Sequence, residues 1–322
     1  MKMLLRLVFL CLSALCAAQA GATGNPAGPL RLVVGFPPGG GTDGAARIIA
    51  EKLPSFLNQP TIVENRGGAG GTLGALNVAR ATPDGNTLFF GTSAEMIINP
   101  VTRKTAPYDV LEQFTPIGEV GSVSFVLVVP ASSPITSVQS LIARAKAQPD
   151  RLNFSSFGIG STNHMLGELF LSRTGIRATH IPYQGSAPAM TALLANEVDF
   201  TFETAAVALP HIKSGKLRAL ATPSPARLRD LPDTPTLTEL GFQDLAAEGW
   251  MGVFAPANMA PDVVQRLNAA LNSVLHMPDV REKLTARGVE VSPGSAGQFR
   301  DMLATEQGKW RRVAQESGIS LD

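Results

Sequence analysis

The chain has 322 residues, of which 44% are hydrophobic and 16% are charged. At about 100–200 residues per domain, this length and composition predict two globular domains and exclude a disordered chain. The formal net charge is +1 and aromatic residues make up 6%, so the sequence lacks the basic, aromatic surface typical of nucleic-acid binding.

Residues 1–20 have the layout of a secretory signal peptide. Two basic residues precede an apolar stretch, 7–18, and a small-x-small cleavage site ends at Ala20. The apolar stretch is too short to span a membrane as a helix. We therefore predict export to the periplasm and cleavage after Ala20. Both cysteines, Cys11 and Cys16, lie in this segment, so we expect a mature chain without disulfides or zinc-binding thiolates.

Short apolar stretches then alternate with stretches of helical periodicity. Strands are expected at 30–36, 61–63, 88–90, 125–129, 152–154, 179–181, 198–202, 217–221 and 250–254. Helices are expected at 45–57, 137–147, 164–171, 187–194, 261–275, 279–287 and 296–316. This alternation predicts an α/β fold with parallel sheets, and the proline-rich segment 222–241 predicts a long connection.

The segment FPPGGGTD, 36–43, joins the first strand to the first helix. Glycines allow a backbone to approach a ligand closely, and the start of a helix offers unpaired N–H groups and a positive dipole end. An ordinary turn between a strand and a helix needs fewer glycines than this segment contains. We therefore interpret it as an anion-binding loop.

The same glycines also match a dinucleotide-binding pattern. Gly39, Gly41 and Gly44 fit G-x-G-x-x-G, and Glu64 stands where that pattern places its ribose-binding acid. Two features argue against this alternative. Two prolines separate the strand from the first glycine, and export removes the chain from the nicotinamide pool. We expect no cofactor.

A second glycine-rich loop, SSFGIGSTNH (155–164), repeats this design in the other half of the chain. Ser161 or Thr162 is placed to cap the following helix, and a plain N-cap is the alternative role for Ser161. His164 is either a ligand contact or a hydrogen-bonded structural residue. Two anion-binding loops, one in each half, suit a two-domain clamp.

Other segments carry weaker signals. Gly91-Thr92-Ser93 ends a strand, where open sheets bind ligands, and 180–186 does the same in the second half. The glycines of 67–74 favour close helix packing over ligand contact. No G-x-S-x-G or H-E-x-x-H motif occurs, and the histidines lack metal-ligand spacing. An acid/base set of Asp43, Glu203 and His164 is the enzyme alternative.

Several segments, in this order and spacing, resemble those of a known family. Over 27–322 the chain is similar to the Bug family of extracytoplasmic solute receptors, the binding proteins of tripartite tricarboxylate transporters. The matching segments are VVGFPPGGGTD (33–43), VENRGGAGGTLGA (63–75), ATPDGNTLFFGTS (81–93), SSFGIGSTNHMLGELF (155–170), HIPYQGSAPA (180–189), HIKSGKLRALA (211–221), LPDTPTLTELG (231–241) and KW (309–310).

The resemblance implies a type II periplasmic-binding-protein fold, with two α/β domains and a ligand cleft between them. Domain 1 is expected to be discontinuous, at 27–124 and 226–322, and domain 2 to be inserted at 125–225. The family holds its ligands between two loops, which correspond here to 36–43 and 156–164.

The resemblance also implies the ligand-binding residues. Phe36 is expected to pack beside the ligand and Ser93 to line the floor. One end of the ligand is then held by Gly40, Gly41, Thr42 and Asp43, and the other by Ser156, Gly160, Ser161 and His164. Asp43 either binds a ligand amino group or orients its loop and nearby waters. Glu203 replaces an Asp that the family often has near the cleft, which affects specificity.

The expected function is capture of a small carboxylate or related metabolite, without chemistry, for delivery to a membrane permease. We expect no metal, no nucleic acid and a monomer. A sensor that delivers ligand to a signalling partner and an enzyme that uses the cleft are the alternatives. Dicarboxylates, tricarboxylates, amino acids and aromatic acids all remain open as ligands.

Overall fold

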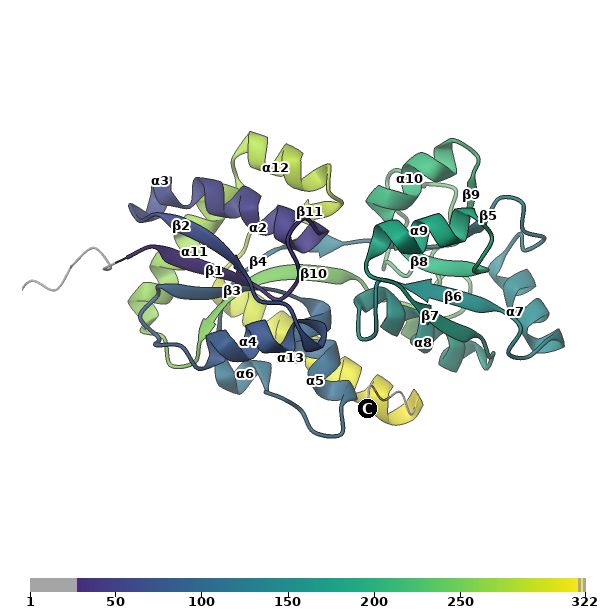
Figure 1. Cartoon of the computed structure of the whole chain (residues 1–322), viewed down its shortest axis with the longest axis horizontal. Helices are drawn as coiled ribbons and strands as arrows, with labels where there is room; N and C mark the ends of the chain where they lie inside the picture. The colour runs from purple at the N-terminus through teal and green to yellow at the C-terminus, as the bar shows by residue number, and fades with distance from the viewer. Residues whose placement is uncertain (1–27, 318–319, 321–322) are drawn as a thin grey trace, which may run out of the picture.

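The computed structural model describes residues 28–317 and Ser320. The predicted signal peptide, 1–20, lies outside the described residues. Figure 1 shows two lobes side by side, each built around one β-sheet with helices packed against it.

The first lobe contains a six-stranded sheet. Its strands are β1 (Leu30–Val34), β2 (Thr61–Asn65), β3 (Thr87–Thr92), β4 (Phe114–Val123), β10 (Gly249–Pro256) and β11 (Val289–Val291). They are arranged in the order β11-β4-β10-β3-β1-β2. β1 is parallel to β2 and β3, whereas β10 is antiparallel to β3 and β4, and β11 is antiparallel to β4.

The second lobe contains a five-stranded sheet. Its strands are β5 (Phe125–Pro130), β6 (Asn153–Ser156), β7 (Thr179–Pro182), β8 (Phe200–Thr204) and β9 (Leu217–Ala221). They are arranged in the order β7-β6-β8-β5-β9. β6 is parallel to β7 and β8, and β5 is antiparallel to β8 and β9.

Helices surround both sheets (Figure 1). In the first lobe they are α2 (Gly41–Lys52), α3 (Pro54–Leu57), η2 (Ala69–Gly71), α4 (Thr72–Ala79), η3 (Ala94–Ile98), α5 (Asn99–Thr102), α6 (Val110–Gln113), α11 (Pro261–Leu275), α12 (Pro278–Thr285) and α13 (Ala296–Ser317). In the second lobe they are α7 (Val138–Ala147), α8 (Thr162–Thr174), α9 (Ser186–Leu194) and α10 (Ala205–Lys213). The short turn η4 (Gln243–Leu245) belongs to the segment that returns from the second sheet to the first.

The chain passes between the sheets twice. Only Ser124 separates β4 from β5, and residues 222–248 lead back from β9 to β10. The two passages lie close together, because Ser124 Oγ donates a hydrogen bond to Glu248 Oε1 over 3.3 Å. The first sheet therefore combines strands from both sides of 125–221 in the sequence. The domain boundaries at 124/125 and 225/226 stay predictions.

Both sheets are mixed, so the expectation of parallel sheets is wrong for β5 and β10. Each of these strands begins where the chain arrives from the other lobe. β5 begins beside the end of β8, with Phe125 opposite Thr204, and the first residues of β10 lie near the end of β3, with Met251 opposite Thr92. A strand that enters its sheet at the carboxyl ends of parallel strands must run against them.

Strand β4 has no counterpart among the predicted elements. Its sequence contains Pro116, Gly118 and Gly121, residue types that strands disfavour. Pro116 lies opposite Phe254, next to an irregularity in the pairing of β4 with β10. A bulge accommodates a proline that a regular strand interior would exclude, since proline has no N–H to donate.

The predicted strands form the core of each lobe. All residues of β5 and β10 are buried, which explains why both read as continuous apolar stretches in the sequence. Large side chains such as Phe89, Phe254 and Trp310 are fully buried. No helix in 28–317 has the length and apolar character needed to cross a membrane.

Candidate functional site

The loops that follow the parallel strands lie on the sides of the two lobes that meet. The chain crosses between the lobes next to the carboxyl ends of β3 and β8, as the pairs Met251–Thr92 and Phe125–Thr204 show. Parallel neighbours end at the same edge of a sheet, so the loops after β1 and β6 open toward this region too. Both predicted loops therefore lie where open α/β sheets bind ligands.

In the first loop, the glycines differ in what the fold requires of them. Gly39 has a φ of +88°, a conformation that other residues rarely adopt. Gly40, with a φ of −76°, has no such requirement. A Cβ atom added to Gly41 would meet no other atom within 4 Å. Both glycines are exposed, so the backbone beside them is open to a ligand.

Helix α2 begins in this loop without a cap. Its first internal hydrogen bond joins the N–H of Gly44 to the carbonyl of Gly40. The N–H groups of Gly41, Thr42 and Asp43 have no acceptor in the described part of the chain. They stand at the positive end of the helix dipole and form a site suited to an anion.

Asp43 holds the first loop in place. Its carboxylate accepts hydrogen bonds from Gly39 N and Arg47 Nε, both at 2.9 Å, and from Asn65 Nδ2 at 2.8 Å. Burial by itself raises the pKa of Asp43, but the bonds from Arg47, Gly39 and Asn65 outweigh it and lower the pKa. These contacts correspond to the loop-orienting alternative. Asn65 Nδ2 also binds the carbonyl of half-buried Phe36.

In the second loop, helix α8 begins at Thr162 and is also uncapped. Ser161 occupies the N-cap position, but its hydroxyl donates to the carbonyl of Gly158 at 2.6 Å and makes no capping bond. The N–H groups of Thr162, Asn163 and His164 have no acceptor among residues 28–317. The second loop thus repeats the arrangement of the first.

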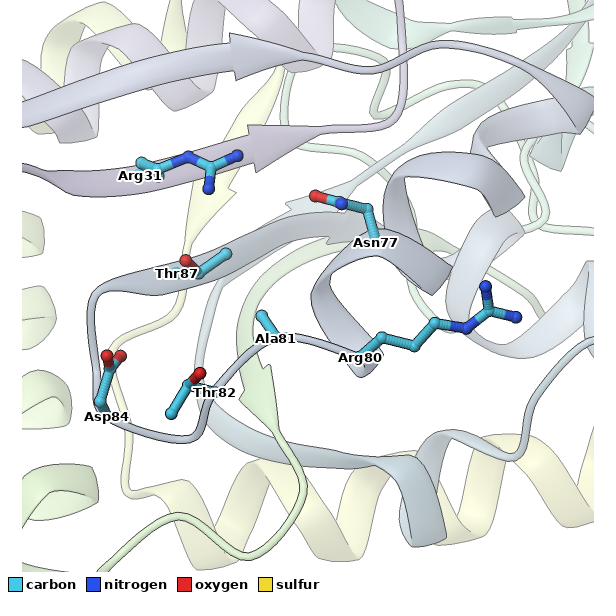
Figure 2. A pocket seen from close by; sticks show the side chains of 7 residues that line it. All are labelled: Arg31, Asn77, Arg80, Ala81, Thr82, Asp84 and Thr87. Atoms are coloured by element: carbon cyan, nitrogen blue, oxygen red, sulfur yellow. The ribbon is translucent and has the colours of Figure 1, made fainter.

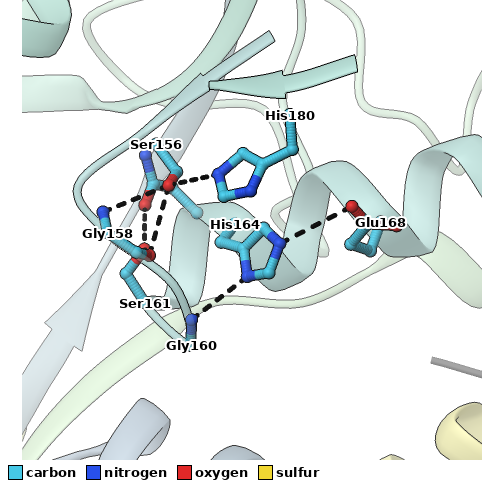
Figure 3. Close-up of polar contacts among 8 residues, drawn as sticks. Ser156, Gly158, Gly160, Ser161, His164, Glu168 and His180 are labelled. Carbon is cyan, nitrogen blue, oxygen red and sulfur yellow. Dashed lines mark hydrogen bonds and ion pairs between the residues drawn. The ribbon is translucent and has the colours of Figure 1, made fainter. Parts of the chain in front are cut away.

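Two stacked histidines support the second loop (Figure 3). His164 Nδ1 accepts a hydrogen bond from Gly160 N at 3.1 Å, and His180 Nε2 lies 2.6 Å from Ser156 Oγ. Ser156 Oγ also accepts the N–H of Gly158 at 3.1 Å. Ser156 is fully buried, and Ser156 Oγ, Gly160 N and His164 Nδ1 form hydrogen bonds within the loop. These three predicted residues therefore shape the loop from behind.

The two lobes touch beside the second loop. Ser93, at the end of β3, has its Oγ 3.2 Å from Thr162 Oγ1 in the first turn of α8. Asn99, at the start of α5, packs against Gly160, because a Cβ on this glycine would lie 2.6 Å from Asn99 Oδ1. The structure thus brings Ser93 to the uncapped start of α8.

Sequence reasoning missed two residues beside the loops and did not foresee the contacts of a third, His180. Asn99 and Glu95 lie between two predicted elements, in a stretch without a motif. His180 begins the quoted segment HIPYQGSAPA, but only pairing of β6 with β7 brings it beside Ser156. The nearby segment 67–74 was interpreted as packing, and its Gly71 is indeed pressed against the Glu95 side chain.

Glu203 is separate from the two loops. Its Oε1 accepts hydrogen bonds from Thr204 N at 2.8 Å and from the hydroxyls of Ser186 and Thr204 at 3.0 Å. It is fully buried, and its Oε2 has no partner among the described residues. Burial raises the pKa of Glu203 to about 7, against the lowering effect of these bonds. The side chain offers no exposed atom to a ligand in this conformation.

Glu64, the acid that the dinucleotide alternative requires, is already paired with two arginines. Glu64 binds Arg31, with Nη2 and Oε2 2.6 Å apart, and also pairs with Arg66. Burial by itself raises the pKa of Glu64, but the hydrogen bonds from these arginines outweigh burial, and the net effect is a lowered pKa. Its carboxylate therefore belongs to an ion-pair network at the end of β2. Within 28–317, no group of His, Asp or Glu side chains is arranged to hold a metal ion.

A pocket of about 370 Å³ lies elsewhere in the first lobe (Figure 2). Arg31 near the start of β1 and Thr87 at the start of β3 lie opposite each other, at the sheet edge away from both loops. In Figure 2 the Arg80 guanidinium points away from Thr82 and Asp84. The lining residues are Arg31, Asn77, Arg80, Ala81, Thr82, Asp84 and Thr87. The uncapped helix starts are better placed for an anion, because they lie where the lobes meet.

Comparison with known proteins agrees with this architecture. Residues 45–319 match the family described as "Tripartite tricarboxylate transporter family receptor". The chain is 39% identical to BugT of Bordetella pertussis over 306 residues, which cover 95% of this chain and 94% of BugT.

Solved structures of similar proteins include two with ligands. R. palustris Rpa4515 with adipate is 33% identical, has a TM-score of 0.81 and covers 92% of this chain and 99% of its own. MatC from Rhodopseudomonas palustris with bound malate is 30% identical, also has a TM-score of 0.81 and covers 89% of this chain and 99% of its own.

These matches confirm the expected two-domain periplasmic-binding-protein fold and the resemblance to the Bug family. The chain belongs to the family of tripartite tricarboxylate transporter receptors, whose members are periplasmic solute-binding proteins.

Proposed function

We propose that the protein captures a small dicarboxylate in the periplasm and delivers it to the permease of a tripartite tricarboxylate-type transporter. The ligand lies between domain 1 (27–124 and 226–322) and domain 2 (125–225), and is bound without being transformed. The observation that carries this proposal is the pair of uncapped helix starts, at Gly41 in α2 and Thr162 in α8.

A bound anion supplies the hydrogen-bond acceptors that the first N–H groups of α2 and α8 lack. Three N–H groups at each start have no acceptor in the described chain, and Gly40 and Ser161 at the N-cap positions do not supply one. A carboxylate oxygen accepts such N–H groups and interacts favourably with the helix dipole. Asp43 does not compete for this place, because Arg47, Gly39 and Asn65 bind its carboxylate.

Two helix starts suit a ligand with two anionic ends. Adipate and malate, the ligands of Rpa4515 and MatC, are both dicarboxylates. One end of the ligand is held at Gly40, Gly41 and Thr42, and the other at Ser161 and Thr162, with Phe36 beside it and Ser93 below. Asp43, Ser156, Gly160 and His164 hold the two loops in shape.

Binding couples to domain closure. A ligand that bonds to both domains stabilises the form in which the two helix starts approach each other. Closure also excludes water, which strengthens the attraction between a carboxylate and the helix N–H groups. The receptor acts as a monomer, and its closed form docks on the membrane permease.

Isothermal titration calorimetry of the mature chain tests this proposal. The ligands are adipate, malate and adipamide, the uncharged diamide of adipate. At least one dicarboxylate binds and the diamide does not. Gly41→Ala weakens binding by about tenfold or more, because a helical Cβ tilts toward the N-terminus of its helix and enters the space before α2.

The matched control is Gly308→Ala in α13. Like Gly41, Gly308 has no atom within 4 Å of an added Cβ. Both substitutions remove a glycine from a helix and stabilise the fold slightly or leave it unchanged. Binding of the diamide as tightly as the acid, or equal affinities in the two variants, would overturn the proposal.

A further inference from the structure

The stacked histidines of the second lobe are joined to the second loop through specific nitrogen atoms. The rings of His164 and His180 have centroids 3.9 Å apart and are inclined by 20°. Phe154 stacks on His180, with centroids 4.9 Å apart. His164 is 7% exposed and His180 is half-buried.

Each ring controls one N–H group of the loop. The Nδ1 atom of His164 accepts the N–H of Gly160 directly. The Nε2 atom of His180 bonds to Ser156 Oγ, and that oxygen accepts the N–H of Gly158. Both glycines have positive φ angles, +130° and +79°, so this stretch depends on outside contacts for its shape.

Because Gly160 N–H points at His164 Nδ1, the proton of the neutral His164 ring lies on Nε2. That nitrogen faces Glu168 Oε1, one helical turn further along α8, at 3.5 Å. Figure 3 shows this chain of contacts from Gly160 through His164 to Glu168. Glu168 thus favours the tautomer that leaves Nδ1 free to accept.

The loop N–H groups fall into two sets as a result. Those of Gly158 and Gly160 are directed at Ser156 and His164, inside the lobe. Those of Thr162, Asn163 and His164, at the start of α8, keep no acceptor within the described residues. The turn that carries the first set leads directly into Ser161, the N-cap residue of α8.

We propose that His164 and His180 are positioning residues that hold the 158–160 turn and thereby direct the first-turn N–H groups of α8 at the ligand. This inference rests on the proposed function, since it assigns how the second end of the anion site is shaped. Neither imidazole touches the ligand. Each acts through one nitrogen, Nδ1 in His164 and Nε2 in His180.

This difference between the nitrogens provides a crossed test. An Asn side chain places its amide group near the position of Nδ1, and a Gln side chain places it near the position of Nε2. We expect His164→Asn and His180→Gln to keep dicarboxylate affinity within about threefold of the wild type. His164→Gln and His180→Asn lose about tenfold, the effect of one misplaced hydrogen bond.

A role in packing alone predicts another result. All four substitutions remove an aromatic ring from the Phe154 stack, so loss of stacking affects them in the same direction. Equal affinities within each pair, or the opposite pattern, would therefore overturn the inference. Melting temperatures recorded for all four variants separate changes in stability from changes in affinity.

A second measurement does not depend on a ligand. Amide hydrogen exchange of the ligand-free protein, followed by NMR, reports on the N–H groups of Gly158 and Gly160. Exchange at Gly160 becomes about tenfold faster in His164→Gln but not in His164→Asn. Exchange at Gly158 becomes faster in His180→Asn but not in His180→Gln.

The two measurements separate this inference from the proposed function. A wild-type protein that binds no dicarboxylate contradicts the proposed function, whereas the exchange rates still test the histidine contacts. Wild-type binding combined with unchanged exchange in all four variants overturns the positioning role alone.

Discussion

Glu95 is a fully buried carboxyl group two residues after Ser93. Its Oε2 accepts hydrogen bonds from the N–H and the hydroxyl of Thr92, at 2.8 and 2.9 Å, while Oε1 has no partner among the described residues. Burial raises the pKa of Glu95 to about 8, because its effect is larger than the lowering effect of the hydrogen bonds from Thr92. The folded protein therefore keeps this carboxyl protonated at neutral pH.

The raised pKa makes the protein less stable as the pH rises. The unfolded chain releases this proton near pH 4.5 and the folded chain near pH 8, so the contribution is complete below pH 4.5 and is lost between these values. We predict that Glu95→Gln abolishes this loss and raises the free energy of unfolding at pH 8 by on the order of 2 kcal/mol. Urea unfolding at acidic pH and at pH 8 measures the effect, with exposed Glu290→Gln as the control. An unchanged pH dependence in Glu95→Gln would contradict the prediction.

Single residues were predictable from sequence only where a local motif carried them. Gly41 and Ser161 stand in glycine-rich turns before a helix, and both lie at uncapped helix starts in the structure. The contacts of His180 and Asn99 arise from strand pairing and from the meeting of the lobes, which no local pattern encodes. For the same reason, sequence did not reveal that Ser156 faces away from the loop surface.

At the scale of elements, helices α2 and α8 begin without a capping side chain, which lowers the free energy of unfolding. Capping side chains contribute about 0.5–2 kcal/mol, and Asp is among the best of them. We predict that Gly40→Asp stabilises the fold by about 1 kcal/mol and weakens dicarboxylate binding by about a hundredfold, because its carboxylate takes the place of the ligand. Thermal unfolding and calorimetry measure the two effects.

The control for this prediction is Gly40→Asn, which caps α2 without a charge. There is room for both side chains, because the nearest atom to an added Cβ at this position is Pro37 O, 3.8 Å away. Asn therefore stabilises the fold to a similar degree but weakens binding less than Asp does. If Gly40→Asp stabilised the protein without weakening binding, α2 would not hold the ligand.

Elements with strong periodicity and the short apolar strands were predicted well, whereas β4, β11 and several short helices were not. The helix expected at 261–275 corresponds to α11, which has a proline at its first position as predicted. β4 was missed because a proline and two glycines interrupt it, and its pairing with β10 compensates through irregularities in register. Packing between strands that are distant in sequence stabilises such a strand, so local propensity does not predict it.

For the whole molecule, the sequence pattern predicted an α/β chain but not the direction of every strand. The alternation of strands and helices says nothing of where the chain changes lobes. β5 and β10 run antiparallel because each begins at the side where the lobes are joined. The same joining places the loops after β3 and β6 in contact, through Ser93 and Thr162.

This contact allows the movement of the lobes to be tested directly. The hydroxyl oxygens of Ser93 and Thr162 are 3.2 Å apart, so thiols at these positions lie within reach of a disulfide. Both natural cysteines precede the predicted cleavage site, so the introduced pair has no competing thiol in the mature chain. We predict that Ser93→Cys combined with Thr162→Cys oxidises to a disulfide that holds the lobes together.

With the lobes held, a ligand can neither enter nor leave at its normal rate. Stopped-flow fluorescence should show association and dissociation both slowed by about tenfold or more in the oxidised double variant, and restored by a reductant. Ser93→Cys alone shows what loss of the serine hydroxyl does without the link. If the disulfide formed and the exchange rates stayed unchanged, ligand exchange would not require the lobes to separate at this contact. Capture by domain closure would then have to involve movement elsewhere along the two passages that join the sheets.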